Sequence, residues 1–147
     1  MKLVVQRVER AEVRVDDEVV GRIGRGMLVL LGILVGDGED QVDRLADRLA
    51  RFRFFQDDEG RMNLDASAVG AAALVVSQFT LSADGRKGRR PSFDRAAPPE
   101  LAEPLYERFV ERLRSAGMAC ETGRFGARMA VELVNDGPVT FVLDEEP

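Results

Sequence analysis

Hydrophobic and polar residues alternate along the first part of the chain, and this alternation predicts β-strands. Residues 2–9 form one expected strand, and residues 11–24 form an expected hairpin that turns at Asp16 and Asp17. Residues 27–35 are an unbroken apolar run bounded by glycines. Such a run is typical of a central strand that is buried on both faces.

Two later segments change to the period of an amphipathic helix. The first covers residues 37–53, with Asp37 as its expected N-terminal cap. The second begins at Pro98-Pro99 and ends before Gly117, its expected C-terminal cap. The apolar stripes are Val42, Leu45, Ala46, Leu49 and Phe52 in the first helix, and Ala102, Leu105, Phe109, Leu113 and Ala116 in the second.

The remaining apolar segments predict further strands: a short aromatic strand before a turn at residues 58–60, a buried strand at 71–81, and two final strands at 128–135 and 138–144. Many strands and only two helices indicate an α/β fold. We expect a layered sandwich of mostly antiparallel sheets, with the two amphipathic helices covering one side. At 147 residues, without a linker or repeat, the chain is expected to form a single domain over residues 1–147.

Composition narrows the possible functions. No apolar run approaches the ~20 residues that cross a bilayer, and the N-terminal segment becomes charged within a few residues, so we expect a cytoplasmic protein with no membrane partner. The formal net charge of -5 argues against broad, nonspecific nucleic-acid binding, and no DNA partner is expected. A local basic patch would still be able to bind RNA.

The chain contains no histidine, which excludes the Ser-His-Asp triad, the Cys-His dyad and imidazole-based zinc sites. The single cysteine, Cys120, forms no CxxC motif and is interpreted as a small apolar residue. Acidic runs near the turn and the C-terminus are interpreted as solvated surface. We therefore expect neither a metal nor a cofactor, and any catalysis must use carboxylates, hydroxyls, backbone groups or the substrate itself.

The segment SQFTL, residues 77–81, places polar side chains where an apolar strand ends. One interpretation is a strand end whose hydroxyls satisfy nearby backbone groups. The other is a site in which Thr80 is a nucleophile or polar contact, and the backbone N–H groups of Phe79 and Thr80 stabilise an oxyanion. Because no histidine is present to activate Thr80, the backbone role is favoured.

The segment GRKGRR, residues 85–90, follows directly and carries four positive charges: Arg86, Lys87, Arg89 and Arg90. It is either a solvated loop or an arm that binds the phosphates of RNA or a nucleotide. Gly137-Pro138 then interrupts the final strand pattern. From sequence alone a trans bond is the favoured state there. A cis bond would present two carbonyls on one side as a rigid acceptor pair for an ammonium group.

Five segments together resemble the bacterial-type D-aminoacyl-tRNA (D-tyrosyl-tRNA) deacylases over essentially the whole chain. They are QRV (6–8), SQFTL (77–81), RRPSF (89–93), TGRFGA (122–127) and VNDGPVTF (134–141). SQFTL and NDGPVT are the two signature motifs of that family. The resemblance implies a homodimer that hydrolyses the ester between a D-amino acid and the 3′-terminal ribose of tRNA.

Carried over residue by residue, the resemblance implies that Gly137 and Pro138, joined by a cis bond, form a chirality gate in the partner's pocket. Ser77, Gln78, Phe79 and Thr80 would line that pocket beneath the adenosine and the ester. Glycyl esters are expected to pass the gate.

Arg7 has two interpretations: it is either a support for the gate carbonyls or a surface strand arginine. Two other functions remain open. One is a related enzyme for tRNA that carries a small L-amino acid, and the other is a noncatalytic RNA-binding module.

Overall fold

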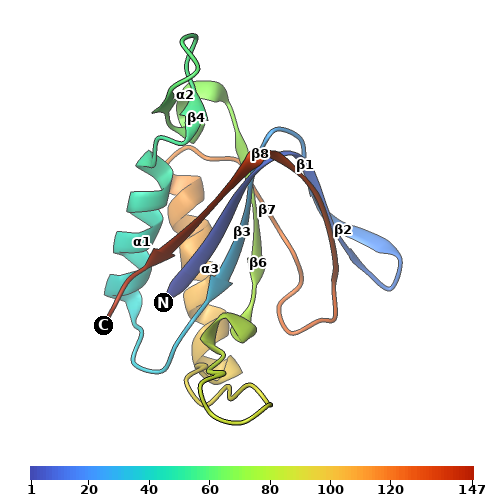
Figure 1. Cartoon of the computed structure of the whole chain (residues 1–147), viewed down its shortest axis with the longest axis vertical. Coiled ribbons are helices and arrows are strands. Elements are labelled where there is room, and N and C mark those ends of the chain that lie inside the picture. Colours follow the sequence, from blue (N-terminus) through green and yellow to red (C-terminus); the bar gives the residue numbers. More distant parts are fainter.

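A computed structural model describes residues 1–147 and shows a curved β-sheet with helices packed against one face (Figure 1). In chain order the elements are β1 (Lys2–Val15), β2 (Glu18–Ile23), β3 (Gly26–Gly32), α1 (Glu39–Arg51), β4 (Phe55–Gln56), β5 (Met62–Leu64), α2 (Ala66–Val69), β6 (Ala72–Ser77), the 3₁₀ turn η1 (Phe79–Ser82), α3 (Pro99–Ser115), β7 (Cys120–Thr122) and β8 (Ala130–Asp144). No helix is both long and apolar enough to cross a membrane.

The strands form one six-stranded sheet and a separate two-stranded ribbon made of β4 and β5. β1 pairs antiparallel with β2, β3 and β8, whereas the β3–β6 and β6–β7 pairs are parallel. The expected mostly antiparallel pairing agrees with four of the six strand pairs, but the strands form one curved sheet and a small ribbon, so the expected sandwich of sheets is not confirmed. Parallel neighbours need a crossover connection, and α1 and α3 provide it. The α/β class and the two amphipathic helices on one side are confirmed.

Apolar side chains form a core on each face of the sheet. The larger cluster, of 25 residues, joins the sheet to α1 and α3. A smaller cluster of 7 residues lies on the other face, where the sheet curls toward itself. The curl brings β2 against β7 so closely that a Cβ atom at Gly21 would lie 2.3 Å from the Thr122 carbonyl oxygen. Only glycine fits at that crossing, and the nearly closed sheet depends on it.

The strand boundaries differ from the predicted ones in three places. β1 runs without the expected break near residue 10, and the two final strands are joined in β8. The strand expected at 71–81 ends at Ser77 because the chain turns into η1. The hairpin turn is confirmed, since Asp16 and Asp17 have φ values of 50° and 65°, the left-handed backbone that such a turn requires.

The helix ends test the predicted caps. Asp37 is not the cap of α1, because Gly38 occupies that position. The Asp37 carboxylate instead accepts hydrogen bonds from the Leu34 N–H at 2.7 Å and from the Met1 ammonium group at 2.9 Å. At the end of α3, Gly117 has a φ of 90° and directly follows the cap residue Ala116, so the helix ends where the sequence predicts.

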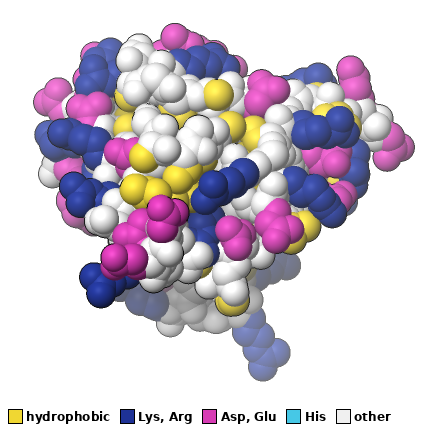
Figure 2. Space-filling view, turned by 90° about the horizontal axis from the view of Figure 1, so that it is seen from above, with side chains coloured by type: hydrophobic (Ala, Val, Ile, Leu, Met, Phe, Trp, Pro, Cys, Tyr) yellow, Lys and Arg dark blue, Asp and Glu magenta, His cyan; other side chains and the backbone are white.

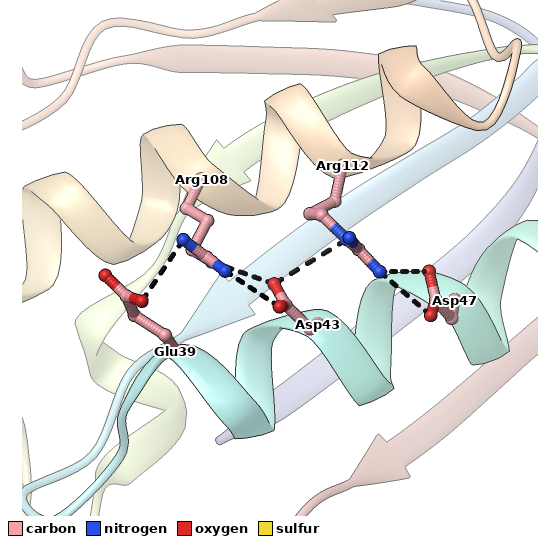
Figure 3. Close-up of polar contacts among 5 residues, drawn as sticks. All are labelled: Glu39, Asp43, Asp47, Arg108 and Arg112. Carbon is pink, nitrogen blue, oxygen red and sulfur yellow. Dashed lines mark hydrogen bonds and ion pairs between the residues drawn. The ribbon is translucent and has the colours of Figure 1, made fainter.

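A ladder of ion pairs joins the exposed sides of α1 and α3 (Figure 3). Arg108 lies 2.8 Å from Asp43 and 3.2 Å from Glu39, and Arg112 lies 3.0 Å from Asp47 and 3.6 Å from Asp43. The hydrogen bond from Arg108 is the main cause that lowers the pKa of the Asp43 carboxyl group below 3.8. The two helices are thus held together by a network rather than by a single pair.

We predict that Asp43→Asn lowers the free energy of unfolding at neutral pH by about 0.5–1 kcal/mol, the range of a partly exposed ion pair. A carboxyl group with a lowered folded-state pKa stabilises the fold above its unfolded-state pKa, and this contribution is lost as the pH falls through the folded-state value. The difference in unfolding free energy between the native protein and the variant should therefore shrink toward about pH 3. Urea unfolding at neutral pH and at about pH 3 measures this difference.

Glu107→Gln is the matched control for this prediction, because Glu107 is an exposed carboxylate on α3 outside the ladder. It should leave the unfolding free energy nearly unchanged at both pH values. An Asp43→Asn variant whose deficit stays constant on acidification would contradict the ion-pair explanation.

Candidate functional site

A largely apolar cavity of about 660 Å³ lies at the end of β6, beside the start of α3. The polar residues of SQFTL stand on its rim, since Ser77 and Gln78 line it together with Phe79. Thr80 is not among its lining residues. The other lining residues are Ile33, Val76, Phe93, Ala96, Ala97, Pro98, Pro99, Ala102, Phe125, Gly126, Ala127, Met129 and Val131.

Sequence reasoning missed most of this wall. The segments around Phe93 and Phe125–Gly126 were recognised only as parts of the motifs RRPSF and TGRFGA, with no role assigned. They lie far from SQFTL in the sequence, and only the folded sheet brings them to the same cavity. The signal was present in those two motifs, but nothing in their spacing indicates a shared pocket.

The backbone of SQFTL leaves two N–H groups without a protein acceptor. The Gln78 N–H donates to the Leu31 carbonyl at 2.8 Å, which fixes the end of β6. The next residues turn into η1, where the Leu81 N–H donates to the Gln78 carbonyl at 3.3 Å. The first N–H groups of a helical turn have no partner within it. Those of Phe79 and Thr80 accordingly form no hydrogen bond inside the protein, which is the arrangement that oxyanion donors require.

The Thr80 hydroxyl has one protein partner, the side-chain amide of Gln78, which donates to it. An amide N–H cannot remove a proton, so this contact does not activate the hydroxyl as a nucleophile. The nearby Ser82 hydroxyl is also occupied, because it donates to the Phe79 carbonyl at 2.7 Å. Side-chain nucleophiles are therefore not prepared at this end of β6, whereas backbone donors are.

Cys120 and Tyr106 do not line the cavity and do not supply a nucleophile. Burial raises the pKa of the Cys120 thiol to about 11 and the pKa of Tyr106 to about 12. The Tyr106 hydroxyl donates to the Val75 carbonyl of β6 at 2.8 Å. Both groups stay protonated near neutral pH, and Cys120 is a buried packing residue, as the sequence predicts.

The segment NDGPVT leaves the regular ladder between β1 and β8. Val8 pairs with Asn135 and Gln6 pairs with Thr140, so a two-residue step along β1 faces a five-residue step along β8. We call the four residues between these two pairs, 136–139, the gate loop. The Asn135 side chain closes the base of the loop through two hydrogen bonds with Val139. Its Oδ1 accepts from the Val139 N–H at 2.8 Å, and its Nδ2 donates to the Val139 carbonyl at 3.1 Å.

The peptide bond between Gly137 and Pro138 is cis, and both residues are exposed. A Cβ atom at Gly137 would lie 2.5 Å from the backbone nitrogen of Val139, closer than real contacts allow. The glycine is therefore required by the shape of the loop. Val139 anchors the other end because its side chain is buried in the larger core.

Arg7 is buried beneath the gate loop, with 4% of its surface exposed. Its Nε donates to the Asp136 carbonyl at 3.0 Å, and its Nη1 donates to the Phe54 carbonyl at 2.9 Å. The Asp136 carboxylate lies 3.3 Å from Nε as well. The alternative of a surface strand arginine is wrong, because the guanidinium group holds the carbonyl directly before Gly137.

The gate loop and the cavity do not meet within one chain. No residue of 136–139 lines the cavity. Figure 1 shows the middle of β8 at the upper end of the sheet and the turn after β6 at the lower end. The SQFTL and NDGPVT motifs are therefore displayed at separate places on the same chain.

The basic segment 85–90 forms a loop closed at its base. Asp84 and Ser92 exchange backbone hydrogen bonds of 2.8 and 2.9 Å. Arg86 is bound to the Asp84 carboxylate at 2.7 Å and lowers the pKa of that carboxyl to about 2. The other three cations of this loop, Lys87, Arg89 and Arg90, are exposed and form no ion pair. By contrast, the upper face in Figure 2 carries positive and negative side chains interspersed.

Comparison with known proteins identifies the family of the chain. The family described as D-Tyr-tRNA(Tyr) deacylase matches residues 4–144. A protein of Symbiobacterium thermophilum named D-aminoacyl-tRNA deacylase is 59% identical over 146 residues, which is 99% of this chain and 97% of the relative. A protein of the same name from Cronobacter sakazakii is 57% identical over 143 residues, covering 97% of this chain and 99% of the relative.

Two solved structures share the fold. One, described as a c-Myc DNA Unwinding Element Binding Protein, has a TM-score of 0.93 and 40% sequence identity, with complete coverage of both chains (100%). The other, described as a probable eukaryotic D-amino acid tRNA deacylase, has a TM-score of 0.83 and 20% identity over 98% of each chain. With the family match and the full-length relatives, these findings show that the chain belongs to the D-Tyr-tRNA(Tyr) deacylase family.

Proposed function

We propose that this chain, a D-aminoacyl-tRNA deacylase by family, hydrolyses the ester between a D-amino acid and the 3′-terminal ribose of tRNA. The products are free tRNA and the D-amino acid, and glycine on a non-cognate tRNA is released in the same way. The observation that carries the proposal is the pair of unpartnered N–H groups of Phe79, which lines an apolar cavity, and of Thr80, the residue that follows it. The reaction takes place in the cytoplasm and uses no cofactor.

The active unit is a homodimer in which the gate loop of one protomer enters the cavity of the other. Two observations support this arrangement. Gly137 and Pro138 are exposed but lie apart from the cavity of their own chain. β8 is an edge strand of 15 residues that pairs only with β1, and an unpaired edge is a surface to which another chain can attach.

Chirality is read by the backbone. The carbonyls of Gly137 and Pro138 accept hydrogen bonds from the α-ammonium group, which fixes the orientation of the Cα substituents. An L side chain would then collide with the gate loop, whereas a D side chain points away from it. Such a collision discriminates more strongly than the ~1–3 kcal/mol that one methylene provides in an apolar pocket. Because no side chain is read, many D-amino acids are accepted.

Hydrolysis uses water and backbone donors. A water oxygen attacks the ester carbonyl carbon, and the resulting oxyanion is held by the N–H groups of Phe79 and Thr80. The bond to the ribose oxygen then breaks, and that oxygen takes up a proton. The ribose 2′-hydroxyl positions the water, while Ser77 and Gln78 contact the adenosine and the ester. Lys87, Arg89 and Arg90 contact tRNA phosphates, and Arg86 joins them from its fixed position on Asp84.

The proposed function is tested with matched D- and L-tyrosyl-tRNA and the native protein. We predict that the D ester is hydrolysed at least ~10²-fold faster than the L ester, because only the L side chain meets the gate loop. Release of labelled tyrosine measures both rates. A protein that binds both tRNAs with steep salt dependence but releases neither amino acid would instead be a noncatalytic RNA-binding module. If a small L-amino acid were released from tRNA faster than its D enantiomer, the chain would be a related enzyme for tRNA that carries a small L-amino acid.

We predict that Thr80→Ala retains activity within ~10-fold of the native enzyme on D-tyrosyl-tRNA, because the substitution keeps the backbone N–H and removes only the hydroxyl. Single-turnover kinetics measure the chemical step. Thr80→Pro, which removes the N–H, is the informative partner variant, and it should lose ~10²-fold or more if it folds. If Thr80→Ala instead lost nearly all single-turnover activity, as an enzyme does when its nucleophile is removed, covalent catalysis would be established and the backbone scheme contradicted.

We predict that Arg7→Lys reduces D-tyrosyl-tRNA hydrolysis ~10²-fold and narrows the ratio of D to L rates. A lysine cannot donate to the Asp136 and Phe54 carbonyls along the two directions that the guanidinium uses, so the gate loop shifts. Arg10→Lys is the matched control on the same strand, since Arg10 is exposed. If Arg7→Lys lowered thermal stability but left the D to L ratio unchanged, Arg7 would be only a stability residue.

A further inference from the structure

Two aromatic rings stand exposed at the mouth of the cavity. Phe79 is 57% exposed and Phe93 is 36% exposed, although both line the cavity. Their ring centroids lie 5.2 Å apart with an angle of 71° between the planes. This edge-to-face contact orients the rings without burying them. Their exposure therefore has no explanation in the core of a single chain.

The position of Phe93 connects the cavity to the basic loop. Ser92, the residue before it, pairs with Asp84 and closes the base of that loop. Phe93 thus stands at the junction between the cavity rim and the loop that carries Lys87, Arg89 and Arg90. These three cations are exposed and form no ion pair within the chain. A polynucleotide that leaves the cavity beside Phe93 would meet them next.

We propose that Phe93 is a stacking platform for the base of the nucleotide that precedes the terminal adenosine of tRNA, and that the basic loop holds the phosphate between these two nucleotides. The inference rests on the proposed function and extends it to a second nucleotide. Unpaired bases are bound by aromatic faces beside cations, because every base presents a π surface and every linkage a negative charge. An exposed ring next to three free cations matches both requirements.

The structure assigns this role to Phe93 rather than to Phe79. The Phe79 ring supports Phe93 from the side, and the Phe79 backbone belongs to the proposed oxyanion site. Phe93 lines the cavity and has no part in that oxyanion site. The substrate class is therefore an aminoacyl ester of at least a dinucleotide, and an aminoacyl-adenosine alone uses only part of the site.

The test compares two small esters of D-tyrosine: one on adenosine and one on the dinucleotide cytidylyl-adenosine. With native enzyme, the dinucleotide ester should have a kcat/KM ~5- to 150-fold higher, the range of one base–aromatic stack. Phe93→Leu should remove this increment, because it lowers kcat/KM on the dinucleotide ester ~5- to 150-fold more than on the adenosine ester. Phe93→Trp should retain it, because the aromatic face is kept. Leu101→Ala is the control, since Leu101 is 60% exposed near the same end but does not line the cavity.

Four outcomes would overturn the inference. The first is an equal kcat/KM of the native enzyme on both esters. The second and third concern Phe93→Leu: the variant keeps the increment, or it loses activity equally on both esters. The fourth is a change of oligomeric state in that variant, which would make Phe93 a contact between protomers. If the variants fail to fold, a dinucleotide ester whose first nucleotide is abasic tests the same point on the native enzyme. A kcat/KM on the abasic ester equal to that on the intact dinucleotide ester would also overturn the inference. If native enzyme releases tyrosine from neither ester nor from tRNA, the proposed function itself fails.

Discussion

The shape of the gate loop in β8 depends on one buried cation. Arg7 donates to the carbonyls of Asp136 and Phe54, which come from distant parts of the chain, and a buried guanidinium is tolerated only where such acceptors are present. The Phe54 ring is buried in the larger core and packs 5.7 Å from the ring of Phe141. Moving any one of these segments would leave a charged donor unpaired, so the gate loop is coupled to the core although its tip is exposed.

The same sheet displays its two motifs at separate ends, and this separation has a consequence for assembly. The cavity is built where β6 ends, whereas the gate loop interrupts β8 opposite Arg7. Both are anchored in the larger core, since Val139 of the gate loop and Ile33 and Ala102 of the cavity wall belong to that cluster. A site that needs both motifs therefore requires either a large rearrangement of one chain or two chains side by side. The unpaired edge of β8 makes the second solution the simpler one.

Sequence patterns predicted local structure better than the arrangement of strands. The helices and the Asp16-Asp17 turn follow from periodicity and turn chemistry, which act within a few residues. The parallel pairing of β3 with β6 and the curl at Gly21 depend on contacts between distant segments, which no short pattern contains. The same limit hid Phe93 and Phe125 as cavity residues. The burial of Arg7 was equally invisible, because its partners are backbone carbonyls, which have no sequence signature.

A chain without histidine places unusual weight on its backbone. The free N–H groups of Phe79 and Thr80 exist because a strand passes directly into a 3₁₀ turn, and this geometry persists whatever the side chains are. Under the proposed mechanism the acceptors of the gate are carbonyls for the same reason. Handedness is a property of the substituents around Cα, so main-chain atoms can sense it without recognising the side chain. The cost is that glycine, which has no side chain to collide with the gate loop, cannot be rejected at such a site.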